Sequence, residues 1–131
     1  MLFRSTFILS QKTFYDLVKE GIEYYKSSDY ENSIDIFNNV INLDDKNHIP
    51  YYYLGLINYS QKSYYDAGEY YKKAWKLGAE SGLINYALGL NAYASNDFDR
   101  ATEYLEEAKT LDPVKYEAEA SKVLLRIDAE R

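Results

Sequence analysis

The residues that could carry catalytic chemistry are few and isolated in this sequence. The chain has one histidine, His48, and no cysteine among its 131 residues. One imidazole without a neighbouring carboxylate motif supplies neither a catalytic triad nor the ligand set of a zinc site. The run Asp44-Asp45-Lys46-Asn47 lacks the alternating oxygen ligands, central glycine and closing glutamate of a calcium loop. No glycine-rich phosphate loop is present either, so the sequence predicts no enzyme, no cofactor and no metal site.

Tyrosine is the residue whose abundance and spacing indicate a different kind of chemistry. The chain contains 16 tyrosines but only five phenylalanines. A tyrosine side chain offers a large contact area at low entropic cost and a hydroxyl that forms hydrogen bonds, and it is enriched at binding hot spots. Tyr25, Tyr59 and Tyr93 recur at a spacing of 34. The tyrosines therefore predict non-covalent recognition of a partner.

The elements that position these tyrosines repeat three times along the chain. Residues 14–47, 48–81 and 82–115 align without gaps. Apolar residues three and four apart predict two amphipathic helices in each repeat. The expected first helices are 14–27, 48–61 and 82–95, and the expected second helices are 30–43, 64–77 and 98–111.

Residues that begin and end helices support these boundaries. Thr13, Asp29, Ser63 and Asp97 are suitable N-caps, because their side chains accept hydrogen bonds from free backbone amides. Gly78 can end its helix in a left-handed conformation. The glycine at the eighth place of each repeat stands inside a helix, so we expect it to permit close approach of the paired helix. The small residues at the twentieth and twenty-seventh places serve the same contact.

This pattern resembles the tetratricopeptide repeat, a 34-residue helix–turn–helix motif. Leu54-Gly55 and Leu88-Gly89 match the family's Leu-Gly pair, and Asp112-Pro113 matches its closing Asp-Pro. Glu20 departs from the pattern, where the first repeat should have leucine. The resemblance covers 102 of 131 residues. It implies an all-α fold, a right-handed superhelix (α-solenoid) of antiparallel helix pairs.

The two ends of the chain complete the expected single domain. Residues 116–131 resemble the helix that caps such arrays, with Ala118, Val123, Leu124 and Ile127 on its apolar face, which gives seven helices in all. Residues 1–13 are expected to form a lead-in helix or an apolar arm that packs on the domain. Their apolar runs are too short for a signal peptide, which favours a cytoplasmic location.

Composition excludes two classes of partner. The net charge is −6, and an acidic chain lacks the field that attracts nucleic acid. No apolar run approaches the ~20 residues of a membrane-spanning helix. We interpret the basic cluster Lys72, Lys73 and Lys76 as a solvated face.

The resemblance also implies where a ligand would bind. In this family the first helices line a concave groove, and the ligand faces the second, fifth, sixth, ninth, twelfth and thirteenth places of each repeat. Some of the tyrosines at these places are also expected to pack between neighbouring helices. Ser60, Ala87 and Ala94 occupy three of the places, and Tyr65, Tyr70, Tyr104 and Tyr116 are tyrosines without an assigned role. The predicted groove residues are Tyr15, Val18, Lys19, Ile22, Tyr25, Lys26, Ile49, Tyr52, Tyr53, Leu56, Tyr59, Leu83, Tyr86, Leu90 and Tyr93.

Two functions remain open at this point. The first is a protein–protein interaction scaffold that binds an apolar peptide or amphipathic helix in the tyrosine-rich groove. The second is a self-associating domain, in which the groove is filled by its own arm or, in a homo-oligomer, by a neighbour's arm, at Phe3, Phe7, Ile8 and Leu9. Some family members clamp the carboxylate tail of a chaperone, and this chain is not expected to do so. The clamp places read Val18, Ile22, Tyr53, Leu83 and Ala87, and none of these side chains donates two hydrogen bonds.

Overall fold

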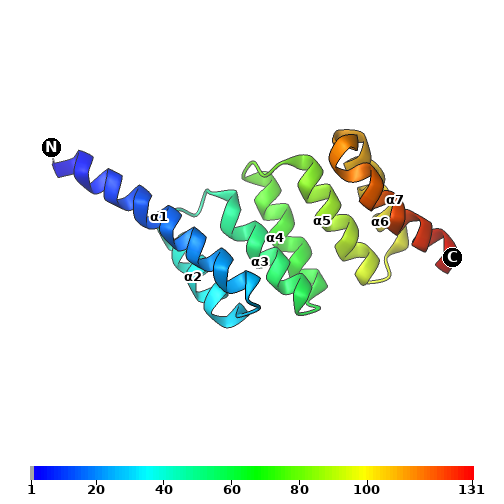
Figure 1. Cartoon of the computed structure of the whole chain (residues 1–131), viewed down its shortest axis with the longest axis horizontal. Helices are drawn as coiled ribbons and strands as arrows, with labels where there is room; N and C mark the ends of the chain where they lie inside the picture. The colour runs from blue at the N-terminus through cyan, green and yellow to red at the C-terminus, as the bar shows by residue number, and fades with distance from the viewer. Residues whose placement is uncertain (1) are drawn as a thin grey trace.

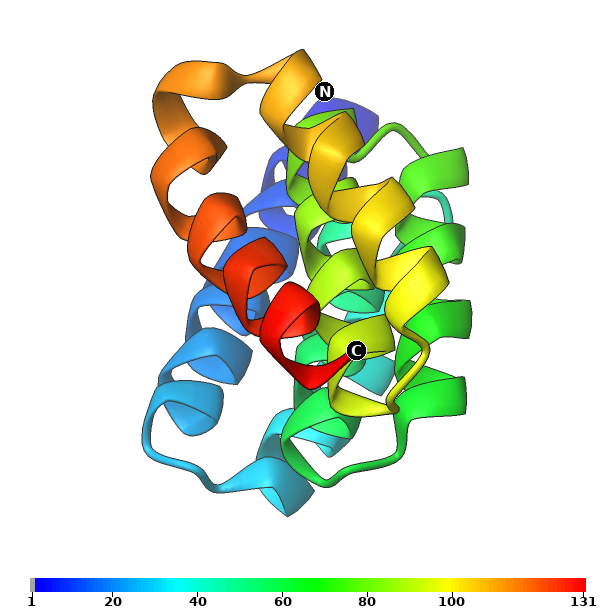
Figure 2. The ribbon, with the colours of Figure 1, turned by 90° about the vertical axis from the view of Figure 1, so that its right-hand side faces the viewer.

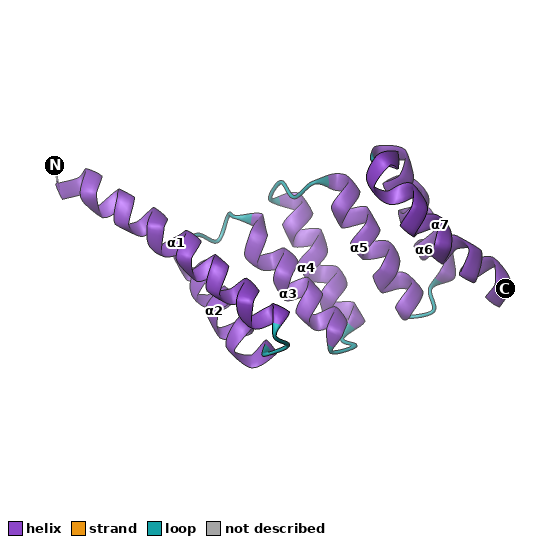
Figure 3. Ribbon diagram, viewed as in Figure 1, coloured by secondary structure: helices purple, strands orange, loops and turns teal. Residues whose placement is uncertain are grey.

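The protein is a stack of antiparallel α-helices. A computed structural model describes the backbone of residues 2–131 and the side chains of residues 13–131, and over this range the chain is helical with no strand. Short loops join successive helices, and the two ends of the chain lie at opposite ends of the stack (Figures 1 and 3). The helices are α1 (Leu2–Lys26), α2 (Tyr30–Leu43), α3 (His48–Ser60), α4 (Tyr64–Lys76), α5 (Ser81–Ala94), α6 (Phe98–Leu111) and α7 (Pro113–Glu130).

Successive helices pair as α1 with α2, α3 with α4, and α5 with α6, and α7 packs against α6 and α5. Figure 2 shows α7 lying across the C-terminal end of the stack. The arrangement confirms the predicted all-α solenoid of seven helices. None of the helices, as far as the chain is described, combines the length and apolar character that a membrane span requires.

The turn within each pair uses the same backbone conformation. Ser28, Lys62 and Asn96 stand at the same place of the three repeats and have φ of 62°, 63° and 64°. The residue that follows each of them caps the next helix. Asp29 and Asp97 accept a hydrogen bond from a backbone amide of the first turn, as predicted, whereas the Ser63 side chain makes no such bond.

The first helix begins earlier than the sequence predicts. α1 starts at Leu2 and already runs through Thr13, so the prediction that Thr13 caps this helix was wrong. Residues 2–13 precede the three 34-residue repeats, so the repeat pattern does not place their helix. The side chains of the predicted arm, Phe3, Phe7, Ile8 and Leu9, lie outside the described residues.

Glycines allow the helices of each pair to approach closely, as predicted. A Cβ on Gly21 would lie 2.8 Å from the Phe37 ring. A Cβ on Gly55 would lie 2.5 Å from the Tyr71 ring, and Leu105 blocks the equivalent site on Gly89 at 2.7 Å. The eighth-place glycine therefore accepts the large side chain from the twenty-fourth place of its own repeat.

The buried apolar residues form three core clusters, roughly one for each repeat. The first cluster contains Phe14, Val18, Phe37, Val40, Leu54 and Ile57. The second contains Ala67, Tyr71, Ala74, Ala79, Ile84, Ala87 and Leu88. The third contains Ala92, Ala101, Leu105, Ala120, Val123 and Ile127.

The buried face of α7 differs in part from the predicted one. Ala118 is exposed, whereas Tyr116, Ala120, Val123 and Ile127 are buried. The observed residues are four, three and four apart, which is the spacing of one helix face. Ala118 lies two residues from both Tyr116 and Ala120, and therefore on another side of the helix.

Candidate functional site

An apolar hollow of about 160 Å³ lies between α3 and α5. The side chains that line it are uncharged, and seven of the eight come from these two helices. Six of the lining residues are predicted groove residues of the second and third repeats. The lining residues are Tyr52, Leu56, Tyr59, Tyr71, Leu83, Tyr86, Ala87 and Leu90.

Helical spacing brings these side chains to the same place. Tyr52, Leu56 and Tyr59 are four and three residues apart and form one stripe along α3. Leu83, Tyr86 and Leu90 form a matching stripe along α5. The two stripes face each other across the hollow because α3 and α5 are equivalent helices of consecutive repeats.

Ring contacts hold the tyrosines of the hollow in place. The Tyr52 ring centroid lies 6.0 Å from that of Tyr71 and 5.5 Å from that of Tyr53 in an edge-on contact. Tyr86 stacks on Tyr116 of α7, with ring centroids 5.1 Å apart. Such aromatic pairs add to the stability that burial provides, so the walls of the hollow are preformed.

Burial strengthens the preference of the tyrosine hydroxyls for the neutral state. It raises the pKa of Tyr52 to about 12. Burial is likewise the largest cause of the raised pKa of Tyr59 and of Tyr86. A neutral phenol both donates and accepts hydrogen bonds. The hollow thus offers an apolar surface with hydroxyl groups that never ionise near neutral pH.

The twelfth-place tyrosines have a packing role that repeats along the chain. Tyr25 lies 6.1 Å from Tyr30, and Tyr59 lies 5.9 Å from Tyr64, between ring centroids. The third copy pairs Tyr93 with Phe98 at 5.8 Å. Each pair joins the two helices of one repeat next to their turn. Packing between neighbouring first helices was expected to account for part of this tyrosine ladder, and Tyr25 also makes such a contact, with its ring centroid 5.7 Å from that of Tyr53 on α3.

The predicted groove residues of the first repeat lie outside the hollow. Val18 is only 6% exposed and packs inside the first core cluster. The helical face of α1 that meets α2 and α3 is wide enough to include the fifth place. Lys19, Lys26 and Tyr15 are exposed, with Tyr15 62% exposed.

The remaining predicted residues are half-buried. Ile22, Tyr25, Ile49 and Tyr53 pack against the first core cluster, and the Tyr53 ring stacks on Phe37 at 5.3 Å. Tyr93 lies near the C-terminal end, where its hydroxyl donates a 2.9 Å hydrogen bond to Glu130. These contacts stabilise the stack and leave the α3–α5 hollow as the place where predicted residues converge.

Two residues of this region were not predicted as part of the site. Tyr71 lines the hollow, and its ring also packs against Gly55. Tyr116 supports Tyr86 from α7. The signal for Tyr116 was available in the sequence, because it begins the buried stripe that continues through Ala120.

The groups that line the hollow are apolar side chains and phenols. Among the described residues, no group of three or more His, Cys, Asp or Glu side chains is placed to hold a metal ion. The hollow contains no titratable side chain other than tyrosine. Its chemistry is therefore contact with apolar groups, together with hydrogen bonds from phenols.

Comparisons with known proteins agree with this architecture. Two family models described as "Tetratricopeptide repeat" match residues 18–81 and 84–115. No curated protein matches the sequence. Solved structures of similar fold include the Yersinia enterocolitica type III secretion chaperone SycD in complex with a peptide of the translocator YopD. That chain is 18% identical with a TM-score of 0.81, over 91% of this chain and 95% of SycD.

Two further structures come from other organisms. The Arabidopsis OM64 TPR domain is 15% identical with a TM-score of 0.81, over 93% of this chain and 99% of that one. The second TPR domain of human RPAP3, in complex with the HSP70 peptide SGPTIEEVD, is 17% identical with a TM-score of 0.78. The match covers 91% of this chain and 98% of that one. At these identities the similarity concerns the fold alone. Since both family matches fall on the helix pairs described above, the chain belongs to the tetratricopeptide repeat family.

Proposed function

We propose that the chain is a protein-interaction module that binds an apolar segment of a partner, such as one face of an amphipathic helix, in the α3–α5 hollow. The uncharged lining of tyrosine, leucine and alanine carries this proposal. A cavity of about 150 Å³ is enough to bind benzene, so the hollow has room for one large apolar side chain. The peptides bound to SycD and RPAP3 support peptide binding as a use of this fold.

A displayed library of random helical peptides tests the proposal directly. We expect the selected peptides to present apolar residues three and four apart. In the Leu83→Lys and Leu90→Lys variants a charge enters the hollow, and desolvation of that charge opposes binding. Affinity measured by titration calorimetry should fall at least tenfold. Leu125→Lys is the matched control, because Leu125 is 69% exposed on α7.

Unchanged peptide affinity in the lysine variants would contradict the proposal. Peptides that bind the Leu83→Lys variant as tightly as the unchanged chain would place recognition elsewhere and refute the proposal. Circular dichroism of each variant shows whether the helices remain intact.

Substitutions of the tyrosines separate the contribution of the aromatic ring to peptide affinity from that of the hydroxyl. Tyr52→Ala or Tyr86→Ala should weaken peptide binding by roughly 2 kcal/mol. Because Tyr86 stacks on Tyr116, Tyr86→Ala also loosens α7. Tyr86→Phe keeps the stacked ring and removes only the hydroxyl, so it measures the hydrogen bond without that loss.

We also propose that the groove does not hold a carboxylate tail. Of the places that form the clamp in related proteins, Val18 and Ala87 are buried and apolar. The peptide SGPTIEEVD, which human RPAP3 binds, should therefore show no saturable binding at about millimolar concentration. Saturable binding that disappears when the peptide's C-terminal carboxylate is amidated would contradict this.

A further inference from the structure

Gly68 is a glycine without a structural reason to be one. Of the six glycines, four lie so close to a neighbour that an added Cβ would come within 2.8 Å of a side chain, and a fifth has φ of +104°. At Gly68 the nearest atom to an added Cβ is Nδ2 of Asn91 at 3.5 Å, an ordinary contact distance. Gly68 lies inside α4, where alanine is more favourable than glycine. Its missing side chain leaves a notch.

Asn91 is a second residue that does not favour stability at its place. Ile57, at the equivalent place of the preceding repeat, is fully buried, and Asn91 is only 8% exposed. Nδ2 of Asn91 donates a 2.8 Å hydrogen bond to the backbone carbonyl of Tyr64. Oδ1 is buried and has no hydrogen-bond partner in the described part of the chain. A buried acceptor without a donor lowers stability.

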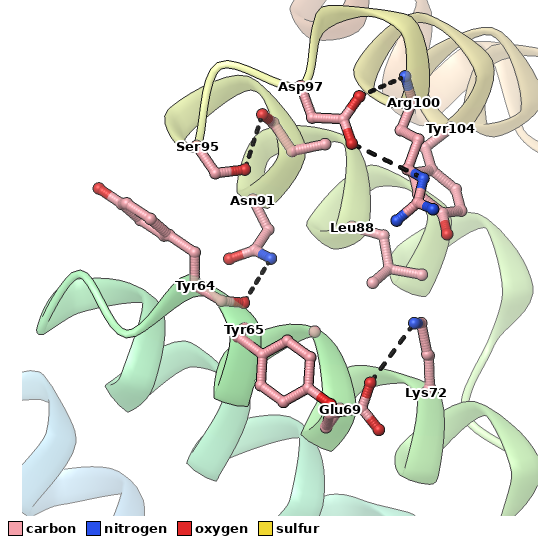
Figure 4. Close-up of a pocket in the computed structure, with 12 residues that line it drawn as sticks. Tyr64, Tyr65, Glu69, Lys72, Leu88, Asn91, Ser95, Asp97, Arg100 and Tyr104 are labelled. Atoms are coloured by element: carbon pink, nitrogen blue, oxygen red, sulfur yellow. Dashed lines mark hydrogen bonds and ion pairs between the residues drawn. The ribbon is translucent and has the colours of Figure 1, made fainter.

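Both residues border one crevice of about 280 Å³ between α4 and α6, with α5 as its floor. Figure 4 shows the Asn91 amide pointing from α5 towards α4, with Leu88 beside it. The buried side chain of Leu88 provides an apolar floor, and Tyr65 and Tyr104 line the crevice from α4 and α6. None of its lining residues belongs to the α3–α5 hollow.

The rim of this α4–α6 crevice is charged but balanced. Lys72 pairs with Glu69 at 3.5 Å on α4, and Arg100 pairs with Asp97 at 3.6 Å beside α6. Each cation therefore has its own carboxylate, and the rim favours neither a cationic nor an anionic anchor. Selectivity must come from the notch, the apolar floor and the amide of Asn91.

We propose that the α4–α6 crevice is a second recognition site, which takes a tryptophan or tyrosine side chain from a partner polypeptide. Residues that lower stability without a structural reason tend to mark functional sites, and Gly68 and Asn91 meet in this one crevice. The group without a partner, Oδ1 of Asn91, is an acceptor, and the indole N–H is a pure donor. The Cβ–Cγ torsion of asparagine is broad, so a rotation of the amide, which also moves Nδ2 away from the Tyr64 carbonyl, turns Oδ1 towards an entering donor.

The size and walls of the crevice fit the same anchor. A cavity of about 150 Å³ holds benzene, so about 280 Å³ has room for the larger indole ring. Tyr65 and Tyr104 offer aromatic surfaces for offset or edge contacts with that ring. Phenylalanine would fill the notch but would leave Oδ1 unpaired. The site should therefore distinguish tryptophan and tyrosine from phenylalanine.

The first test is an NMR titration of the ¹⁵N-labelled full chain with N-acetyl-tryptophanamide. We expect saturable shifts at Gly68, Leu88 and the side-chain amide of Asn91. N-acetyl-phenylalaninamide, which has a ring without a donor, should bind at least fivefold more weakly. Equal affinity for the two compounds, or shifts confined to other residues, would overturn the proposal.

Two variants then test whether Gly68 and Asn91 serve ligand binding or have only a structural role. Gly68→Ala and Asn91→Ile should each raise the urea midpoint of unfolding and weaken N-acetyl-tryptophanamide binding at least tenfold. A variant that gains stability without losing affinity refutes the proposal. Lys62→Gly is the matched control, because it relieves backbone strain outside the crevice and should leave affinity unchanged.

The hollow and the crevice are also distinguished from each other. Leu83→Lys should weaken peptide binding in the α3–α5 hollow at least tenfold yet keep N-acetyl-tryptophanamide binding, so either site can fail alone. A second copy of the chain is the competing source of an aromatic anchor. If the crevice shifts appear on raising the concentration of the chain alone, a second copy fills the site and the proposal of a partner polypeptide is wrong.

Discussion

Individual tyrosines of the hollow link burial to the pH dependence of stability. Burial raises the pKa of Tyr52 from 10.0 to about 12. Between these values the unfolded chain loses its phenolic proton while the folded chain keeps it. The free energy of unfolding is therefore unaffected by Tyr52 below about pH 10 and falls as the pH rises towards 12.

Urea unfolding at a series of alkaline pH values measures this fall. Tyr52→Phe should flatten the decline without abolishing it, because burial also raises the pKa of Tyr71. Tyr65→Phe is the matched control for removal of a tyrosine hydroxyl, since Tyr65 is 79% exposed. An unchanged slope in Tyr52→Phe would show that this phenol ionises equally in both states.

Lys62 is a single residue that stores backbone strain. Its φ of 63° is left-handed, which costs most L-residues about 1–2 kcal/mol, whereas glycine adopts it freely. Glycine loses more conformational entropy on folding than lysine does, and this loss offsets part of the relieved strain. Lys62→Gly should therefore raise the free energy of unfolding by about 0.5–1 kcal/mol. Chemical denaturation measures the gain. The adjacent Gln61→Gly, at φ −88°, should instead lower stability.

At the scale of the element, α7 shows how one helix face closes the array. Ile127 is 1% exposed within the third core cluster, and Leu125 is 69% exposed on the same helix. Ile127→Ala should cost about 2–4 kcal/mol through lost contacts and a cavity. Leu125→Ala should change stability by less than about 0.5 kcal/mol. Thermal or urea unfolding of the two variants compares them, and equal losses would contradict the capping role of the buried face.

The elements themselves were largely predictable from the sequence. The apolar period places α2 and α6 at their observed bounds, and the repeat alignment also predicts the observed helix starts at His48 and Tyr64. Asp112 caps α7 and Pro113 occupies its first turn, where its missing amide costs nothing. These features depend on interactions between residues that are close in the sequence, so the sequence is sufficient to predict them.

The site was less predictable, because it depends on contacts between repeats. In this family the fifth place of each repeat faces the groove, and Val18 was predicted there for that reason. Whether a fifth-place side chain is buried also depends on how its helix is rotated against the next repeat, and Val18 is buried. The α4–α6 crevice arises from the combination of Gly68 and Asn91, which are 23 residues apart. Neither residue alone differs visibly from a helix glycine or a polar surface residue.

At the scale of the whole molecule, the stack behaves as a one-dimensional chain of core clusters. The helices that pack extensively against each other are at most two apart in the sequence. In such arrays stability is a sum of repeat and nearest-neighbour terms. A substitution that destabilises one core cluster should therefore lower the local free energy of unfolding most strongly in its own repeat. A globular core, by contrast, would distribute the damage over the entire domain.

Native-state hydrogen exchange tests this with two matched substitutions. Phe37 and Leu105 stand at the same repeat place and are both fully buried, in the first and third core clusters. Phe37→Ala should remove about 3–5 kcal/mol of local stability and accelerate exchange chiefly in α1 and α2. Leu105→Ala should do the same chiefly in α5 and α6. If both variants raised exchange equally in all helices, the array would open as one unit, and the local model of its stability would be wrong.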